Sequence, residues 1–245
     1  EYSKIASNWR SQQTLSDYLK ENNILGIEGI DTRALTLHIR QTGAMKAVLS
    51  TKDLDEGNLV KKAKDSPGLI GVDLVKEVTS NHKYVWDKAK EDKYRVVVID
   101  CGVKYNILAK LLENKCQVTV VPAKTSADEI FKMRPDGILL SNGPGDPTAV
   151  SYVIETTRRL IGKVPIFGIC LGHQMLGLAF GGKTYKLKFG HHGANHPVKD
   201  LKTGKVSITV QNHGFCVDIA SLDKKQIEIT HINLNDQTLE GMRHK

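Results

Sequence analysis

The sequence has few cysteines, few aromatic residues and no long apolar segment. Its cysteines form no Cys-x-x-Cys pair, which argues against both a disulfide framework and a zinc finger. Aromatic residues make up 6% of the chain, too few for a visible base-stacking platform. No apolar run approaches the roughly 18–20 residues of a membrane helix. We therefore expect no membrane role, no nucleic-acid partner and a reducing, cytoplasmic compartment. The cysteines are Cys101, Cys116, Cys170 and Cys216.

The basic residues are dispersed, although the formal net charge is +8. The longest cluster is Lys61-Lys62 with Lys64. Nucleic-acid-binding domains concentrate such charge on one face or along one helix. The dispersal therefore supports the exclusion of nucleic acid.

A polar, highly charged stretch near residue 90 separates two apolar patterns, as a linker does. We predict that residues 1–85 belong to a smaller N-terminal α/β domain. Residues 86–93 are then the linker, and residues 94–245 form a second, larger domain.

In the N-terminal part, the pattern predicts helices over residues 15–22 and 31–40 and a short strand over residues 27–30. Asp31 is a suitable N-cap, because its carboxylate accepts the first free backbone N–H groups. Gly43 is expected to end the second helix.

Beyond residue 94, short apolar strands alternate with amphipathic helices. This alternation predicts a doubly wound, mostly parallel α/β sheet. After Thr184, polar and apolar residues alternate one by one, which predicts antiparallel strands with one face exposed to solvent. The predicted strands of the parallel sheet are 96–99, 118–121, 138–140 and 165–167, and the helices are 107–112, 127–133 and 150–161.

Cys170 stands where a predicted strand meets a helix, inside the segment Gly-Ile-Cys-Leu-Gly-His-Gln of residues 168–174. This is the Gly-x-nucleophile-x-Gly spacing of a nucleophile elbow, whose tight turn leaves no room for Cβ atoms at the glycines. The helix N-terminus is expected to lower the thiol pKa, and the Leu171 N–H to donate to an oxyanion. The alternative is a small buried cysteine without reactivity.

A second loop, residues 141–147 with the sequence Ser-Asn-Gly-Pro-Gly-Asp-Pro, follows another buried strand. The carboxyl ends of parallel strands are where α/β folds bind ligands. Taken alone, the loop is equally consistent with an ordinary turn.

Together the two segments resemble the class I glutamine amidotransferase family. Three further segments narrow the resemblance to the small-subunit family of carbamoyl-phosphate synthetases, and it extends to Gly-Ile-Asp-Thr-Arg at residues 29–33. These segments are residues 100–107, 188–198 and 211–215.

The resemblance implies that Cys170 attacks the side-chain amide of L-glutamine, forms a glutamyl thioester and releases ammonia. The implied partner is a large synthetase subunit that makes carbamoyl phosphate from bicarbonate and ATP for arginine and pyrimidine synthesis. ATP and magnesium belong to that subunit, so no cofactor and no metal is expected on this chain. The residues that the resemblance assigns to glutamine binding are Gly143, Gly145, Leu171, Gln174, Asn212, Gly214 and Phe215.

The sequence departs from the family in one respect. The family pairs its thiol with a histidine that a glutamate orients, in a His-Pro-Glu motif absent from these 245 residues. His244 is not in a matching context. An upstream serine segment is also missing, so we expect a chain truncated at both ends. Such a chain should turn glutamine over poorly, because losing a general base costs orders of magnitude.

Two further patterns carry alternative interpretations. Residues 177–184 match the phosphate-loop sequence, but they are predicted to run from helix to strand, the reverse of a phosphate loop. His191, His192 and His196 suggest a metal site, yet their spacing is not diagnostic, and we favour loop-stabilising or subunit-contacting roles.

Two rival functions stay open. One is another cysteine hydrolase with the same elbow, such as a peptidase or deglycase, which substrate turnover would distinguish. The other is a non-catalytic interaction module, for which an inert Cys170 would be evidence.

Overall fold

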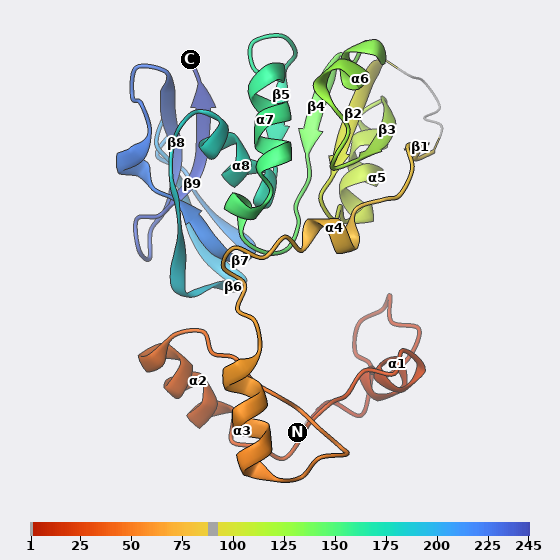
Figure 1. Cartoon of the computed structure of the whole chain (residues 1–245), viewed down its shortest axis with the longest axis vertical. Coiled ribbons are helices and arrows are strands. Elements are labelled where there is room, and N and C mark those ends of the chain that lie inside the picture. The colour runs from red at the N-terminus through yellow and green to blue at the C-terminus, as the bar shows by residue number, and fades with distance from the viewer. Residues whose placement is uncertain (1, 88–92) are drawn as a thin grey trace. The chain divides into compact units, whose positions relative to one another are not determined.

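The computed structural model describes residues 2–87 and 93–245, and it divides into two compact units, residues 1–67 and 68–245 (Figure 1). The predicted linker, residues 86–93, includes residues 88–92, which lie outside the described residues. The predicted domain limits therefore stay a prediction.

The described residues of the first unit form three helices, α1 (Leu15–Glu21), α2 (Thr32–Thr42) and α3 (Glu56–Asp65). Both helix predictions are confirmed, and Asp31 caps α2 by accepting from the Ala34 N–H. Gly43 ends α2 with a φ of 98°, a conformation open mainly to glycine.

The predicted strand over residues 27–30 is wrong, because these residues form no strand in the structure. A short extended segment needs a neighbouring strand to pair its backbone groups, and the described part of this unit contains no strand at all. Its large apolar side chains are exposed, Trp9 by 86% and Leu54 by 78%. Side-chain caps and local hydrogen bonds, rather than an apolar core, define these helices.

The second unit contains a five-stranded sheet in the order β1-β3-β2-β4-β5. Strand β2 pairs in parallel with β3 and β4, and β4 pairs in parallel with β5. Strand β1 pairs antiparallel at the β3 edge. The predicted parallel sheet is confirmed, and only the short edge strand was not predicted. The bounds are β1 Tyr84–Val85, β2 Tyr94–Asp100, β3 Cys116–Pro122, β4 Gly137–Leu140 and β5 Ile166–Gly168.

Helices cover both faces of this sheet, as a doubly wound fold requires. Val97, Ile99 and Leu140 pack on one face in a core that includes residues of α6, α7 and α8. Val98 and Val120 point to the other face, where α5 packs. The helices are α4 Val75–Val78, α5 Tyr105–Glu113, α6 Ala127–Lys132, α7 Ser151–Leu160 and α8 Leu171–Ala179, with 3-10 turns at Pro147–Ala149 and Ile219–Ser221.

A second, antiparallel sheet in the order β7-β6-β8-β9 follows α8, which confirms the antiparallel strands predicted after Thr184. The phosphate-loop match runs from α8 into β6, as predicted. No helix among the described residues is long and apolar enough to cross a membrane. The strands are β6 Thr184–Asp200, β7 Val206–Val217, β8 Ile227–Asn233 and β9 Leu239–His244.

Candidate active site

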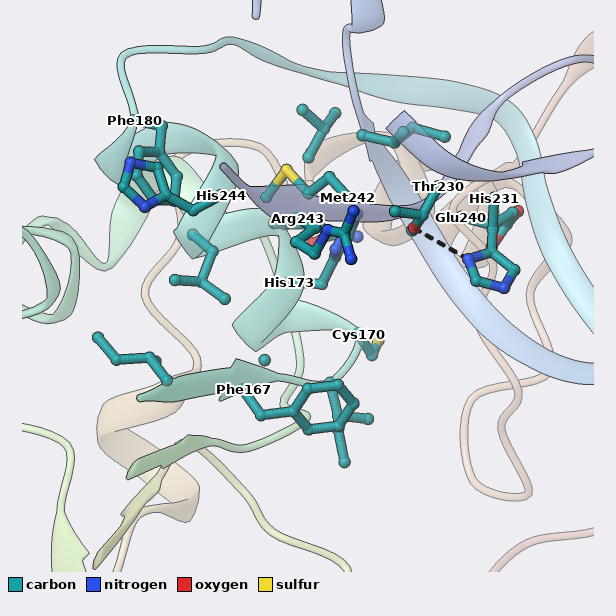
Figure 2. A pocket seen from close by; sticks show the side chains of 18 of the residues that line it. Phe167, Cys170, His173, Phe180, Thr230, His231, Glu240, Met242, Arg243 and His244 are labelled. Carbon is teal, nitrogen blue, oxygen red and sulfur yellow. Dashed lines mark hydrogen bonds between the residues drawn. The ribbon is translucent and has the colours of Figure 1, made fainter. Parts of the chain in front are cut away.

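Cys170 lies at the junction of β5 and α8 with φ 54° and ψ −107° (Figure 2). A non-glycine residue rarely adopts positive φ, and such strain persists only where the surroundings enforce it. The strained turn places the side chain at the pocket between the two sheets of the second unit. The predicted nucleophile elbow is therefore present.

The two elbow glycines have no room for a side chain. A Cβ on Gly172 would lie 2.2 Å from the Leu140 carbonyl oxygen, and a Cβ on Gly168 would lie 2.6 Å from the backbone of Gly172. Because the obstructing atoms are backbone, they cannot move without shifting β4 or α8. The close approach of strand and helix explains the Gly-x-Cys-x-Gly spacing.

Cys170 is half-buried, whereas the other three cysteines are buried. Burial raises the pKa of Cys101 to about 12 and that of Cys216 to about 11. Both of those thiols are protonated at neutral pH and shielded from solvent, so Cys170 is the best placed of the four to react.

The pKa of the Cys170 thiol is raised from its ordinary value, so the predicted lowering is wrong for this structure. Burial is the largest cause, and it outweighs the Leu171 N–H bond to the sulfur and the charge of Lys104, both of which lower the pKa. In the described part of the chain, no hydrogen bond joins this sulfur to an imidazole.

The second loop is fixed to the elbow by hydrogen bonds. The Ser141 hydroxyl accepts from the Cys101 N–H at 2.9 Å, and the Ser141 carbonyl accepts from the Gly172 N–H at 3.1 Å. A Cβ on Gly143 would lie 2.2 Å from the Cys101 carbonyl oxygen. The loop backbone therefore packs against the turn that carries Cys170, as expected of two segments at the carboxyl ends of neighbouring strands.

A pocket of about 1150 Å³ opens at Cys170. Of the residues predicted to bind glutamine, Gln174, Asn212 and Phe215 line it together with Cys170. The other four, Gly143, Gly145, Leu171 and Gly214, are not among the lining residues. All seven assignments stay predictions.

Gln174 connects α8 to the second sheet. Its side-chain amide is buried and donates to the Phe215 carbonyl at 2.6 Å. This bond fixes the position of β7 relative to the helix that carries the nucleophile. One amide N–H is engaged in this bond, so the second amide N–H and the amide oxygen of Gln174 remain available to a ligand.

His173 follows the elbow and lines the same pocket (Figure 2). Its Nε2 is buried without a hydrogen-bond partner, and burial lowers the pKa of this histidine to about 4. Sequence reasoning assigned it no role. The segment Gly-His-Gln after the nucleophile gave no signal of this burial.

The low pKa of His173 predicts acid sensitivity. The folded state holds the proton less well than the unfolded state, whose histidine titrates near 6.5, so stability falls as the pH drops from about 6.5 to about 4. The loss amounts to at most about 3 kcal/mol. The variant His173→Leu should remove this component of the pH dependence in urea unfolding. The exposed-residue variant His38→Gln is the control, and an unchanged pH dependence in His173→Leu would contradict the interpretation.

The wall opposite Cys170 belongs to the antiparallel sheet and includes Glu240, Met242 and Arg243 of β9 (Figure 2). His213 of β7 lines the pocket as well, and burial is the main cause that lowers its pKa. The sequence gave no sign of Glu240, because single polar residues on an alternating strand have no distinctive spacing. One group of described residues could hold a metal ion, namely His191, His213 and Glu240.

Comparison with known families agrees with this geometry. Residues 97–245 match the glutamine amidotransferase class-I family. Residues 1–49 match the CPSase domain of the carbamoyl-phosphate synthase small chain. The two matches lie in the same order along the chain as the two predicted domains.

Solved structures share the fold of the second unit. A candidate GMP synthase component from Thermoplasma acidophilum superposes with a TM-score of 0.53 and 21% identity, over 62% of this chain and 78% of that one. A glutamine amidotransferase from Thermotoga maritima superposes with a TM-score of 0.50 and 16% identity, over 62% of this chain and 71% of that one. At such low identity the likeness concerns the fold alone.

Curated proteins give a much stronger match. The carbamoyl phosphate synthase small chain of Syntrophotalea carbinolica is 54% identical over 250 residues, covering 97% of this chain and 66% of that protein. The small chain from Aquifex aeolicus is 52% identical, over 98% of this chain and 67% of that protein. The chain thus spans about two thirds of the length of these relatives. It belongs to the class-I glutamine amidotransferase family and, within that family, to the carbamoyl phosphate synthase small chains.

Proposed function

We propose that this chain is the glutamine-hydrolysing part of a carbamoyl-phosphate synthetase, with Cys170 as the nucleophile. The observation that carries the proposal is the strained elbow, which presents a half-buried thiol to a pocket in a member of this family. A cysteine that only packs in the core would need neither the positive φ nor the two crowded glycines.

The reaction proceeds in two steps. The Cys170 sulfur attacks the side-chain carbonyl carbon of L-glutamine, the C–N bond breaks, and the nitrogen takes up a proton and leaves as ammonia. Water then cleaves the thioester, which releases glutamate and restores the thiol. The Leu171 N–H, at the start of α8, donates to the oxyanion as the carbonyl becomes tetrahedral.

The substrate contacts are those that the family resemblance assigns. Among them, Gly143, Gly145 and Gly214 can offer only backbone groups, and they do not line the pocket of this structure. The Asn212 and Gln174 amides bind the polar ends of glutamine, and Phe215 packs on its methylene groups. Ammonia passes to a large synthetase subunit, which carries the ATP and magnesium.

We further propose that the 245-residue chain by itself turns glutamine over slowly. Its thiol has a raised pKa and no imidazole bonded to it within the described residues, so little thiolate forms at neutral pH. Both attack and thioester hydrolysis then lack a general base, which typically contributes 10²–10⁴-fold.

Coupled synthesis tests the proposed function. The chain is mixed with a carbamoyl-phosphate synthetase large subunit, bicarbonate and Mg-ATP, and carbamoyl phosphate is measured with glutamine or ammonia as nitrogen donor. We expect glutamine to support slow synthesis that disappears in Cys170→Ala. Carbamoyl phosphate synthesis with ammonia but not with glutamine would overturn the proposal. Hydrolysis of peptides in place of glutamine would overturn it as well.

A further inference from the structure

Side chains from three strands of the antiparallel sheet converge beside the pocket: His191 on β6, His213 on β7 and Glu240 on β9. One ligand atom from each lies within 4.8 Å of the others. His191 Nδ1 is 3.3 Å from His213 Nε2 and 3.5 Å from Glu240 Oε1. Ligand atoms around a tetrahedral zinc ion with bonds of about 2.0–2.1 Å lie about 3.3–3.4 Å apart. These two separations fit ligands that share one ion, and the third pair of ligand atoms, on His213 and Glu240, lies within 4.8 Å.

The outer hydrogen bonds indicate which nitrogen of each neutral ring carries the proton. His213 Nδ1 lies 2.8 Å from the Phe215 carbonyl, which only accepts, so this nitrogen carries the hydrogen. His191 Nε2 lies 2.7 Å from a carboxylate oxygen of Asp236, so it also donates. In the neutral rings, His191 Nδ1 and His213 Nε2 therefore present lone pairs to each other. Metal-binding histidines in proteins are held in this way by a carboxylate or a carbonyl.

A further acceptor faces the same point. Gln211 donates its amide N–H to Thr209 Oγ1 at 3.2 Å, which turns its amide oxygen toward His213 Nε2, also at 3.2 Å. No N–H or O–H donor reaches either of the two facing ring nitrogens in the described part of the chain. Facing lone pairs repel unless a cation lies between them.

The carboxylate is also held in place and sheltered. Glu240 Oε1 accepts from the Asn233 side-chain amide at 3.3 Å, and its side chain is only 12% exposed. The His191 side chain is 6% exposed. Two imidazoles and one carboxylate form a donor set that suits zinc and similar transition metals better than magnesium or calcium.

We propose that His191, His213 and Glu240 bind one divalent transition-metal ion of the zinc class, with the Gln211 amide oxygen or a water as the fourth ligand. The bound ion ties β6, β7 and β9 together. It thereby fixes the β7 segment that carries Asn212 and Phe215 on the pocket wall. The site stands independently of glutamine hydrolysis, since none of its evidence involves Cys170.

Zinc titration of the 245-residue chain tests the proposal. The Cys170→Ala background removes the most exposed thiol, and competition with a chromophoric chelator reports stoichiometry and affinity. We expect one equivalent of Zn²⁺ bound by the parent and none by His191→Gln or Glu240→Gln. Asp236→Asn, a change at a half-exposed carboxylate outside the ligand set, should weaken binding about 10- to 100-fold without disturbing the fold. His192→Gln, a change at an exposed neighbouring histidine, is the matched control and should bind as the parent does.

Cobalt provides a second measurement. Co²⁺ bound at this site should give the visible absorption of a four-coordinate ion, and Zn²⁺ should displace it. Circular dichroism confirms that each variant is folded. Less than one equivalent of zinc in the parent would overturn the proposal and leave a shared proton as the cation. Equal zinc affinity in the parent, His191→Gln and Asp236→Asn would overturn it as well.

Discussion

Replacing Cys170 by alanine is expected to lower the rate of glutamine hydrolysis at least about 10³-fold, because the acyl group has no other nucleophile to which it can transfer. Glutamate release at saturating glutamine measures the effect. The loss should fall on kcat, since the pocket around the missing sulfur is otherwise intact.

The matched control is Cys116→Ala. Cys116 is buried at the start of β3 and does not line the pocket, so its loss should leave the rate nearly unchanged. The parental rate should also rise with pH, because burial raises the pKa of the Cys170 thiol and more thiolate forms in alkaline solution. Equal activities of Cys170→Ala and Cys116→Ala would show that another group performs the reaction.

The substitution Gly172→Ala is expected to destabilise the second unit by about 3 kcal/mol or more, at the upper end of overpacking effects. The added Cβ would lie 2.2 Å from the Leu140 carbonyl oxygen and 2.8 Å from the Leu140 Cβ. Strand β4 or helix α8 must then move, and the Cys170 turn moves with it. Urea unfolding followed by circular dichroism gives the change in free energy.

Gly137→Ala is the control for this substitution. The Cβ added to Gly137 meets only the Pro165 carbonyl, at 3.9 Å, which is ordinary contact. Its effect should stay within about 1 kcal/mol, the range of glycine-to-alanine changes at compatible sites. Similar free energies for both variants would mean that the elbow is not as tightly packed as the structure indicates.

Much of the larger unit could be predicted from sequence because each element carries a local signal. Apolar runs such as residues 96–99 fit strands buried on both faces, and the helices have one apolar stripe each. The elbow glycines identified Cys170, since their crowding reflects two adjacent backbones rather than distant partners. The two-residue strand β1 has too little sequence to give such a signal.

Other features depend on contacts that sequence order does not reveal. The segment 27–30 has strand-like residues, but no described strand of its unit pairs with it. The pKa of Cys170 was predicted from the helix alone, whereas burial between strand and helix decides its direction. The proposed metal ligands come from separate strands, so the spacing of His191, His192 and His196 gave no indication of the site. The sequence analysis expected a chain without a metal, and the metal site is a proposal against that expectation.

Labelling of Cys170 by a glutamine-analogue electrophile tests the central claim most directly. Intact mass and peptide mapping follow modification of the four cysteines, with and without L-glutamine. Cys101 and Cys216, whose pKa values are raised to about 12 and about 11, serve as internal controls. We predict that Cys170 alone is labelled and that glutamine protects it. Equal labelling of all four cysteines, or labelling of Cys170 that glutamine does not slow, would contradict an accessible, reactive Cys170 in a glutamine site.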